Sequence, residues 1–210
     1  MAGLKPRQSD WKSGFLFLGN HLVLDFLNTR PIVDGAPVEL LPDVSALLRW
    51  FQLADLLSPR QAAHLDKQWA NSLRTRRTLQ ALREFREKLR TQTLAWEHSG
   101  VIQRSTIGDL NWLMARHPMG MSLTGHGRAW TIAPSFEARD PEDFFAPLAH
   151  SAAVLFSTAD HRRVRKCASC VLHFQDISKK GTRRWCSMQL CGNRLKVAAY
   201  AARKRTLVVR

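Results

Sequence analysis

The sequence predicts an α+β protein in two parts. The first is a mainly α-helical N-terminal domain that carries one β-hairpin, and the second is a small C-terminal zinc-binding module made of a knuckle, a β-hairpin and a helix. Three observations support this prediction: apolar residues at helical spacing through the first three quarters of the chain, all four cysteines inside the stretch 167–191, and a strong excess of basic residues in the same region. We expect the domains to span residues 1–160 and 161–210.

The N-terminal region opens with an apolar stretch, Phe15–Thr29, that is interrupted by Gly19 and Asn20. The stretch fits either a strand followed by a helix or two strands, since periodicity does not separate these for short apolar runs. The segment Pro31–Pro42 follows, and its three prolines and one glycine predict a loop.

Four helices are expected next. Asp43 is a suitable N-cap for the first, and Ser58 followed by Pro59 begins the second. The third spans Leu73–His98, a stretch without glycine or proline that Gly100 closes. The fourth is short, opens at Ser105 and ends before Pro118.

The remainder of the first domain changes character. Residues 121–134 alternate in polarity on both sides of a Gly-His-Gly segment, which predicts a β-hairpin. Asp140 and Pro141 then begin a further helix, which Pro147 is expected to kink or restart.

The charge of the chain is unevenly distributed. The sequence has 32 Lys and Arg against 17 Asp and Glu, a net charge of +15. Residues 161–210 hold 14 basic residues and one acidic residue, a net +13, which leaves +2 for residues 1–160. A basic module on a near-neutral body indicates a polyanionic partner, and we expect nucleic acid. No apolar run approaches the ~20 residues of a membrane span, so we expect a cytoplasmic protein without membrane contact.

The four cysteines are spaced Cys167-x2-Cys170-x15-Cys186-x4-Cys191. Two close pairs separated by about 15–20 residues are typical of a Zn²⁺ site. Four thiolates fill a tetrahedral shell and leave no open position for water, so the site is expected to be structural. Two disulfides or a redox Cys-x-x-Cys are the competing interpretations. Disulfides are disfavoured in a reducing compartment, and a redox Cys-x-x-Cys does not require the second cysteine pair.

Within the module, we expect His173–Ile177 and Arg183–Trp185 to form a hairpin around a turn at Ser178–Thr182. A helix over Met188–Arg205 should follow, with an apolar stripe opposite a basic face that suits a DNA major groove. Asn193 and Arg194, in its first turn, are expected near base edges or as supports of the turn. The residues predicted to contact nucleic acid are Lys179, Lys180, Arg183, Arg184, Asn193, Arg194, Lys196, Arg203, Lys204 and Arg205.

The motif Asp176-Ile-Ser178, then Arg183-Arg-Trp-Cys-Ser-Met188, then Cys191-Gly-Asn-Arg194 resembles the CGNR zinc-finger family of bacteria. The N-terminal motif Gly19-Asn20-x-Leu22-x-Leu24-Asp25-Phe26-x-Asn28-Thr29 is similar to the start of the ABATE domain that precedes this finger. The resemblance implies a stress-related transcription regulator with four cysteine ligands and a DNA-binding finger. This chain differs from the family in its shorter first cysteine pair and in the polar residues His173 and Gln175.

The sequence favours a regulator over an enzyme. It has no His-Glu-x-x-His, no glycine-rich phosphate loop and no Gly-x-Ser-x-Gly. Asp25 and Asn28 are candidates to line a small-molecule pocket. The alternative is that Asp25 caps or orients local backbone, and this alternative is favoured. The first hypothesis is a DNA-binding regulator whose body senses a small-molecule effector or forms a homodimer. An RNA-binding protein and an enzyme with its site in the N-terminal domain are the alternatives.

Overall fold

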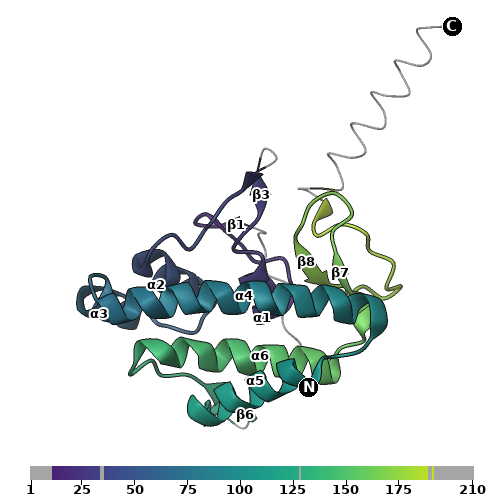
Figure 1. Cartoon of the computed structure of the whole chain (residues 1–210). Helices are drawn as coiled ribbons and strands as arrows, with labels where there is room; N and C mark the ends of the chain where they lie inside the picture. The colour runs from purple at the N-terminus through teal and green to yellow at the C-terminus, as the bar shows by residue number, and fades with distance from the viewer. Residues whose placement is uncertain (1–10, 34–35, 128, 189–190, 192–210) are drawn as a thin grey trace, which may run out of the picture.

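The computed structural model describes residues 11–33, 36–127, 129–188 and 191. Figure 1 shows a helical body with a small strand-containing module at one end. The elements in chain order are β1 Trp11–Lys12, β2 Phe15–Leu16, α1 Leu22–Leu27, β3 Ile32–Val33, β4 Ala36–Pro37, α2 Val44–Leu53, α3 Pro59–Trp69, α4 Leu73–Ser99, α5 Arg104–Arg116, β5 Gly120–His126, β6 Ala129–Ser135, η1 Pro141–Phe144, α6 Phe145–Thr158, η2 His161–Arg163, β7 Val164–Lys166 and β8 His173–Gln175.

The ends of α2, α3 and α4 follow the signals in the sequence. The Asp43 carboxylate accepts a hydrogen bond from the Ala46 backbone N–H at 2.7 Å, and Ser58 forms a reciprocal capping box with Gln61. Gly100 ends α4 in the left-handed conformation, with φ of +70°, where a glycine carries no steric cost. The predicted caps of these helices are confirmed.

Other elements differ in detail from the expectation. Phe15–Thr29 forms a strand and then a helix, and the expected loop 31–42 contains the short β3–β4 hairpin. The expected start of α5 at Ser105 is wrong, because the helix begins at Arg104 and Gln103 precedes it without a side-chain cap. Pro147 lies in the first turn of α6, where a backbone N–H has no acceptor within the helix. Proline therefore costs no helical hydrogen bond at this position.

The core of the body is arranged around α1, which contacts both α4 and α6. Phe26 packs with Trp50 and other aromatic side chains of α2 and η1, while Leu24 and Leu27 pack with α4, α5 and α6. Figure 1 shows α4 along the length of the body with α6 alongside it, and α5 packs against α6. None of the described helices is long and apolar enough to cross a membrane.

A buried ion pair ties α4 to the segment that precedes α2. Arg86 is 1% exposed, and it donates to both carboxylate oxygens of Glu39 and to the Thr29 hydroxyl. These bonds lower the pKa of Glu39, although its burial acts in the opposite direction. A bidentate guanidinium–carboxylate pair of this kind is one of the few ways to bury arginine in a small body.

The strands form four antiparallel pairs, β1–β2, β3–β4, β5–β6 and β7–β8. The predicted hairpin at 121–134 is confirmed as β5–β6. The predicted hairpin of the zinc module is wrong in its pairing: β8 pairs with β7 across the Cys167–Cys170 knuckle, and Arg183–Trp185 is not a strand. The knuckle itself reverses the chain, so the segments on either side of it are the ones that pair.

Candidate metal centre and its contact with the body

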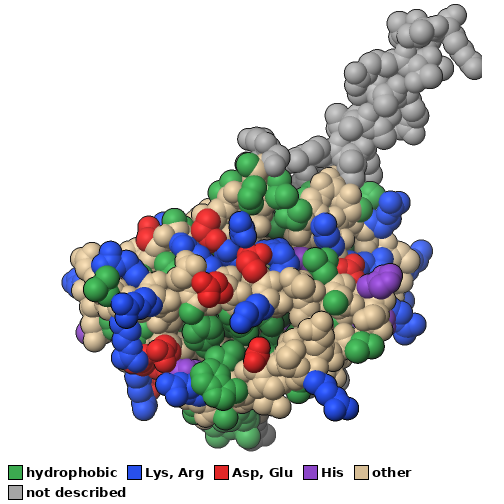
Figure 2. Space-filling view, viewed as in Figure 1, with side chains coloured by type: hydrophobic (Ala, Val, Ile, Leu, Met, Phe, Trp, Pro, Cys, Tyr) green, Lys and Arg blue, Asp and Glu red, His purple; other side chains and the backbone are tan. Residues whose placement is uncertain are grey.

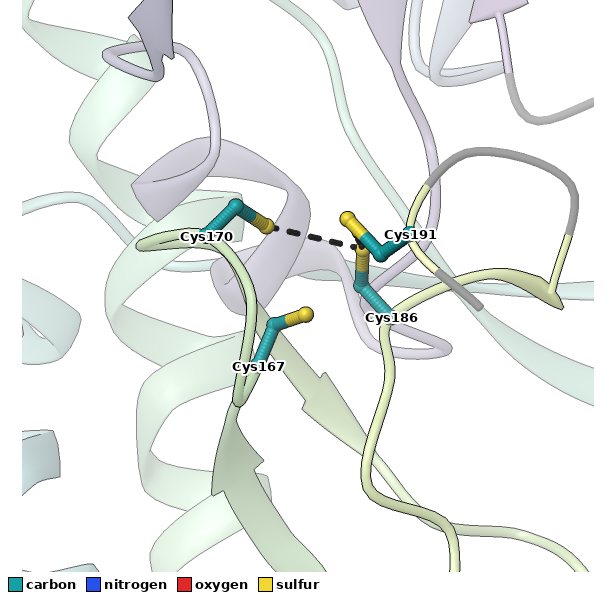
Figure 3. Close-up of side chains that lie close together, drawn as sticks. All are labelled: Cys167, Cys170, Cys186 and Cys191. Carbon is teal, nitrogen blue, oxygen red and sulfur yellow. Dashed lines mark hydrogen bonds between the residues drawn. The ribbon is translucent and has the colours of Figure 1, made fainter. Parts of the chain in front are cut away.

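The four cysteine sulfurs come together at the tip of the β7–β8 hairpin (Figure 3). All four Sγ atoms lie within 4.8 Å of one another, and Cys186 Sγ is 3.7 Å from the sulfurs of both Cys170 and Cys191. A tetrahedral ion with Zn–S bonds of about 2.3 Å requires sulfurs about 3.8 Å apart. The cluster is therefore positioned to hold one metal ion.

Backbone hydrogen bonds shape the first knuckle. The Cys167 N–H donates to the Leu172 carbonyl at 2.8 Å and closes the turn. The Ser169 N–H points at Cys167 Sγ at 3.5 Å, and the Ala168 N–H donates to the Arg184 carbonyl at 3.0 Å. The last bond joins the first cysteine pair to the segment that carries the second.

Asp176 and Arg183 fix the segment between the two cysteine pairs. The buried Asp176 carboxylate accepts from the backbone N–H groups of Ser178 at 2.9 Å and Arg183 at 2.8 Å. The Arg183 guanidinium lies 4.8 Å from the Phe174 ring centroid and donates to the carbonyls of Trp185 and Cys186. These contacts explain why Arg183–Trp185 holds its position without strand pairing.

The thiols influence one another strongly. Hydrogen bonds from Cys170 and Cys186 lower the pKa of the Cys167 thiol far below its ordinary value. Their donation to Cys167 raises the pKa of Cys170 to about 12 and also raises that of Cys186. Binding of a metal by four thiolates therefore displaces protons, and acid weakens such binding.

The N-terminal motif forms one contact between the module and the body, and α4 forms another through η2 and β7. The buried Asn28 amide clamps the backbone of His173: its Oδ1 accepts from the His173 N–H and its Nδ2 donates to the His173 carbonyl, both at 2.8 Å. Asn20 Nδ2 donates to the Gln175 carbonyl at 2.9 Å, and the Gln175 N–H donates to the Gly19 carbonyl at 2.8 Å. The motif thus pairs with β8 from the side that β7 leaves open.

Asp25 acts on the same motif from within. Its Oδ1 accepts a hydrogen bond from the Gly19 N–H at 2.7 Å, and the side chain is 6% exposed. A Cβ at Gly19 would lie 2.6 Å from Leu24 Cβ, so glycine is needed at this close approach. Of the two interpretations of Asp25, orientation of local backbone is the one that the geometry fits.

Apolar packing adds to these hydrogen bonds. Leu16 and Leu18 from the first domain share one buried cluster with Leu172, Phe174 and the cysteines. The side of the metal centre toward the body is therefore closed by residues from the start of the chain. The domain boundary at residue 160 remains a prediction, and the two predicted domains share this core.

The basic residues predicted to bind nucleic acid fall into three groups. Lys179, Lys180 and Arg184 are exposed, and Figure 2 shows Lys and Arg side chains at the end of the molecule where β7 and β8 lie. Arg183 is half-buried, with its guanidinium engaged by the module itself. The others, together with the predicted helix after Met188, lie outside the described residues: Asn193, Arg194, Lys196, Arg203, Lys204 and Arg205.

Two buried histidines should make the protein sensitive to acid. Burial lowers the pKa of His173 to about 3 and that of His21 to about 4, from 6.5. Both fold as neutral groups, so the unfolded chain binds more protons below pH 6.5 and stability falls with the pH from 6.5 toward 4. Each contributes a slope of about 1.4 kcal/mol per pH unit in this window.

The test is urea unfolding of the zinc-loaded chain and of His173→Leu at several pH values. His173 Nδ1 is buried without a hydrogen-bond partner among the described residues, so leucine should be tolerated at pH 7. The slope of the free energy of unfolding against pH should be smaller in the variant than in the wild type, by about 1.4 kcal/mol per pH unit. Identical slopes for the two proteins would show that His173 is not held neutral.

Together, these features define a class: a helical body with a four-cysteine metal module attached through its N-terminal motif. Residues 163–204 match the family model of the CGNR zinc finger. Residues 20–159 match the model of ABATE, described as "Putative stress-induced transcription regulator". A comparison with curated proteins gives no match. The chain belongs to the ABATE family and carries a CGNR zinc finger, and the cofactor of the cysteine cluster is Zn²⁺.

Sequence reasoning missed the clamp made by Asn20 and Asn28. All three bonds are to backbone atoms about 150 positions away, and nothing in local spacing indicates such a partner. The available signal was the pair of asparagines in an otherwise apolar segment, since a buried amide must find partners. The structural use of Arg183 was also missed, because a basic residue in a basic module resembles its exposed neighbours.

Proposed function

We propose that the chain is a DNA-binding transcription regulator whose zinc finger makes the nucleic-acid contacts. The observation that carries the proposal is the net charge of +13 in residues 161–210, the region that contains the four cysteines, against +2 in the rest. Electrostatic attraction to phosphates requires such a concentration of basic residues. The regulator description of the ABATE family supports the same function.

In this proposal Cys167, Cys170, Cys186 and Cys191 bind one Zn²⁺ as thiolates. The filled shell makes the metal structural, because no position remains for water or substrate. The exposed side chains of Lys179, Lys180 and Arg184 contact phosphates, and Arg183 supports the module.

The predicted helix after Met188 extends the surface. Asn193 and Arg194 act at base edges or hold the turn after Cys191. Phosphate contacts position the helix without specifying sequence. They are assigned to Lys196, Arg203, Lys204 and Arg205.

The body supplies regulation in this proposal, by sensing an effector or by dimerisation. A polar hollow between α4 and the β3–β4 segment is lined by Arg30, Glu39, Arg83 and Glu87. Its charges already pair with one another and with Arg86, so its chemistry indicates no particular effector. The proposed site of action is the cytoplasm, where bacterial DNA lies. No catalytic role is proposed.

The phosphate contacts are testable through salt dependence. Removing Lys179 and Lys180 together should reduce the slope of log affinity against log salt by about 1.8, since each phosphate contact contributes about 0.9. The loss should be equal on all duplex sequences. Lys67→Ala, an exposed lysine on α3, is the control and should leave the slope unchanged. Fluorescence anisotropy at several salt concentrations measures the slope. An unchanged slope in the double variant would exclude this turn from the interface.

A further inference from the structure

The β5–β6 hairpin exposes an apolar face. Met121 is 65% exposed, Leu123 63%, Trp130 59% and Ile132 66%. Figure 2 shows hydrophobic side chains along the lower edge of the molecule, where Figure 1 places β6. Scattered exposed apolar residues are ordinary, but four large ones on one short hairpin form a contiguous patch.

The register of the hairpin gathers these side chains on one side. Leu123 lies opposite Ile132, Met121 opposite Pro134, and Trp130 opposite Gly125. Directly opposed residues project to the same face of an antiparallel pair. The other face carries small and polar residues, among them the opposed pair Thr124 and Thr131. Neither strand contains Asp, Glu, Lys or Arg, the charges that commonly protect a free strand edge.

The hairpin stands apart from the helices. β5 and β6 contact each other extensively, and no other helix or strand in the described part of the chain packs substantially against them. A lone two-stranded hairpin is only marginally stable in water. Covering this apolar face would therefore stabilise the hairpin, and the described part of the chain supplies no such cover.

The size of the face matches a dimer. Four large side chains that are each 59–66% exposed form a patch near the upper end of what a monomer usually leaves uncovered. Pairing two such faces approaches the ~1,200 Å² at which the range for specific interfaces begins. The hairpin also lies on the near-neutral domain, at the far side of the body from β7 and β8 (Figure 1). Two copies joined here keep their basic modules apart and accessible.

We propose that the apolar face of the β5–β6 hairpin is a homodimer interface, in which Met121, Leu123, Trp130 and Ile132 pack against the same residues of a second copy. A self-complementary patch on both partners is what a twofold interface requires. The interface joins the two zinc fingers in one assembly. It stands independently of the proposed DNA binding, because it rests on the hairpin alone.

The experiment is sedimentation equilibrium of the full zinc-loaded chain without nucleic acid, across the micromolar range. The wild type should be dimeric. The double variant Leu123→Glu/Ile132→Lys keeps an opposite-charge pair across the strands and so preserves the hairpin, but it removes the apolar centre. Its dimer should be weakened by about 100-fold or more, because the new charges would have to be desolvated. The matched control, Thr124→Glu/Thr131→Lys, places the same charges on the opposite face and should remain dimeric.

Three outcomes would overturn the proposal. The first is a wild type that stays monomeric throughout the micromolar range. The second is a dimer that both double variants retain or both lose. The third is a monomer that co-sediments with phosphatidylglycerol vesicles through Leu123 and Ile132, which would make the hairpin a lipid-binding surface. Circular dichroism of each variant confirms that the helical body is intact, so a change in association is not mistaken for unfolding.

Discussion

Cys186→Ser should release the zinc and unfold the module. Cys186 is fully buried, and its sulfur lies 3.7 Å from two others. Serine supplies no thiolate, and structural Zn²⁺ contributes about 10–16 kcal/mol of apparent binding free energy in small finger peptides at pH 7. The expected result is a fall from one zinc per chain to substoichiometric metal. Hydrogen exchange should become fast in β7 and β8 and stay slow in α4.

The control is Ser169→Ala in the same knuckle. Ser169 contributes its backbone N–H to Cys167 Sγ, and alanine retains that group. This variant should bind zinc as the wild type does. Metal analysis with hydrogen-exchange mass spectrometry measures both effects. A Cys186→Ser protein that keeps one zinc and slow exchange in β8 would show that the four thiolates are not the ligand set.

Asn28→Ala should loosen the module from the body without removing the zinc. The substitution leaves the buried His173 N–H and carbonyl unpaired, and each orphaned group costs about 1–3 kcal/mol. The expected loss is therefore about 2–6 kcal/mol in the free energy of unfolding. Limited proteolysis should begin to cut between the end of α6 and Cys167, while metal content stays at one zinc per chain.

Asn20→Ala is the matched comparison, because it removes one partly buried bond to the same strand. Its cost should be about 1 kcal/mol. Chemical unfolding of the three proteins measures the series. If Asn28→Ala and Asn20→Ala cost equally little, the amide clamp does not hold the module, and the apolar packing of Leu16 and Leu18 and the remaining backbone bonds hold it instead.

Much of the helical body is predictable because its signals are local. Asp43, Ser58 and Gly100 act on groups within a few residues, so the ends of α2, α3 and α4 follow from the sequence. Alternation along 121–134 predicts β5–β6 for the same reason. The start of α5 does not follow from the sequence in this way. Serine is a preferred N-cap, which favours a start at Ser105, but the helix begins at Arg104 and has no side-chain cap.

The metal centre is predictable from cysteine spacing, whereas its surroundings are not. The strand pairing depends on the knuckle, which turns the chain within six residues and brings β7 beside β8. Arg183 is held by Phe174 and two carbonyls that come together only after folding. Asn28 finds its partner 145 residues away. Contacts of such separation leave no periodic trace in a single sequence.

Sequence-specific DNA binding by the zinc finger is tested by selecting duplexes from a random library with the zinc-loaded chain and titrating the enriched sequence. This sequence should bind at least ~10³-fold more tightly than random duplex at physiological salt, and Cys186→Ser should lose the preference. Equal affinity for enriched and random duplex, tighter binding to single-stranded RNA, or full retention of the preference in Cys186→Ser would contradict it.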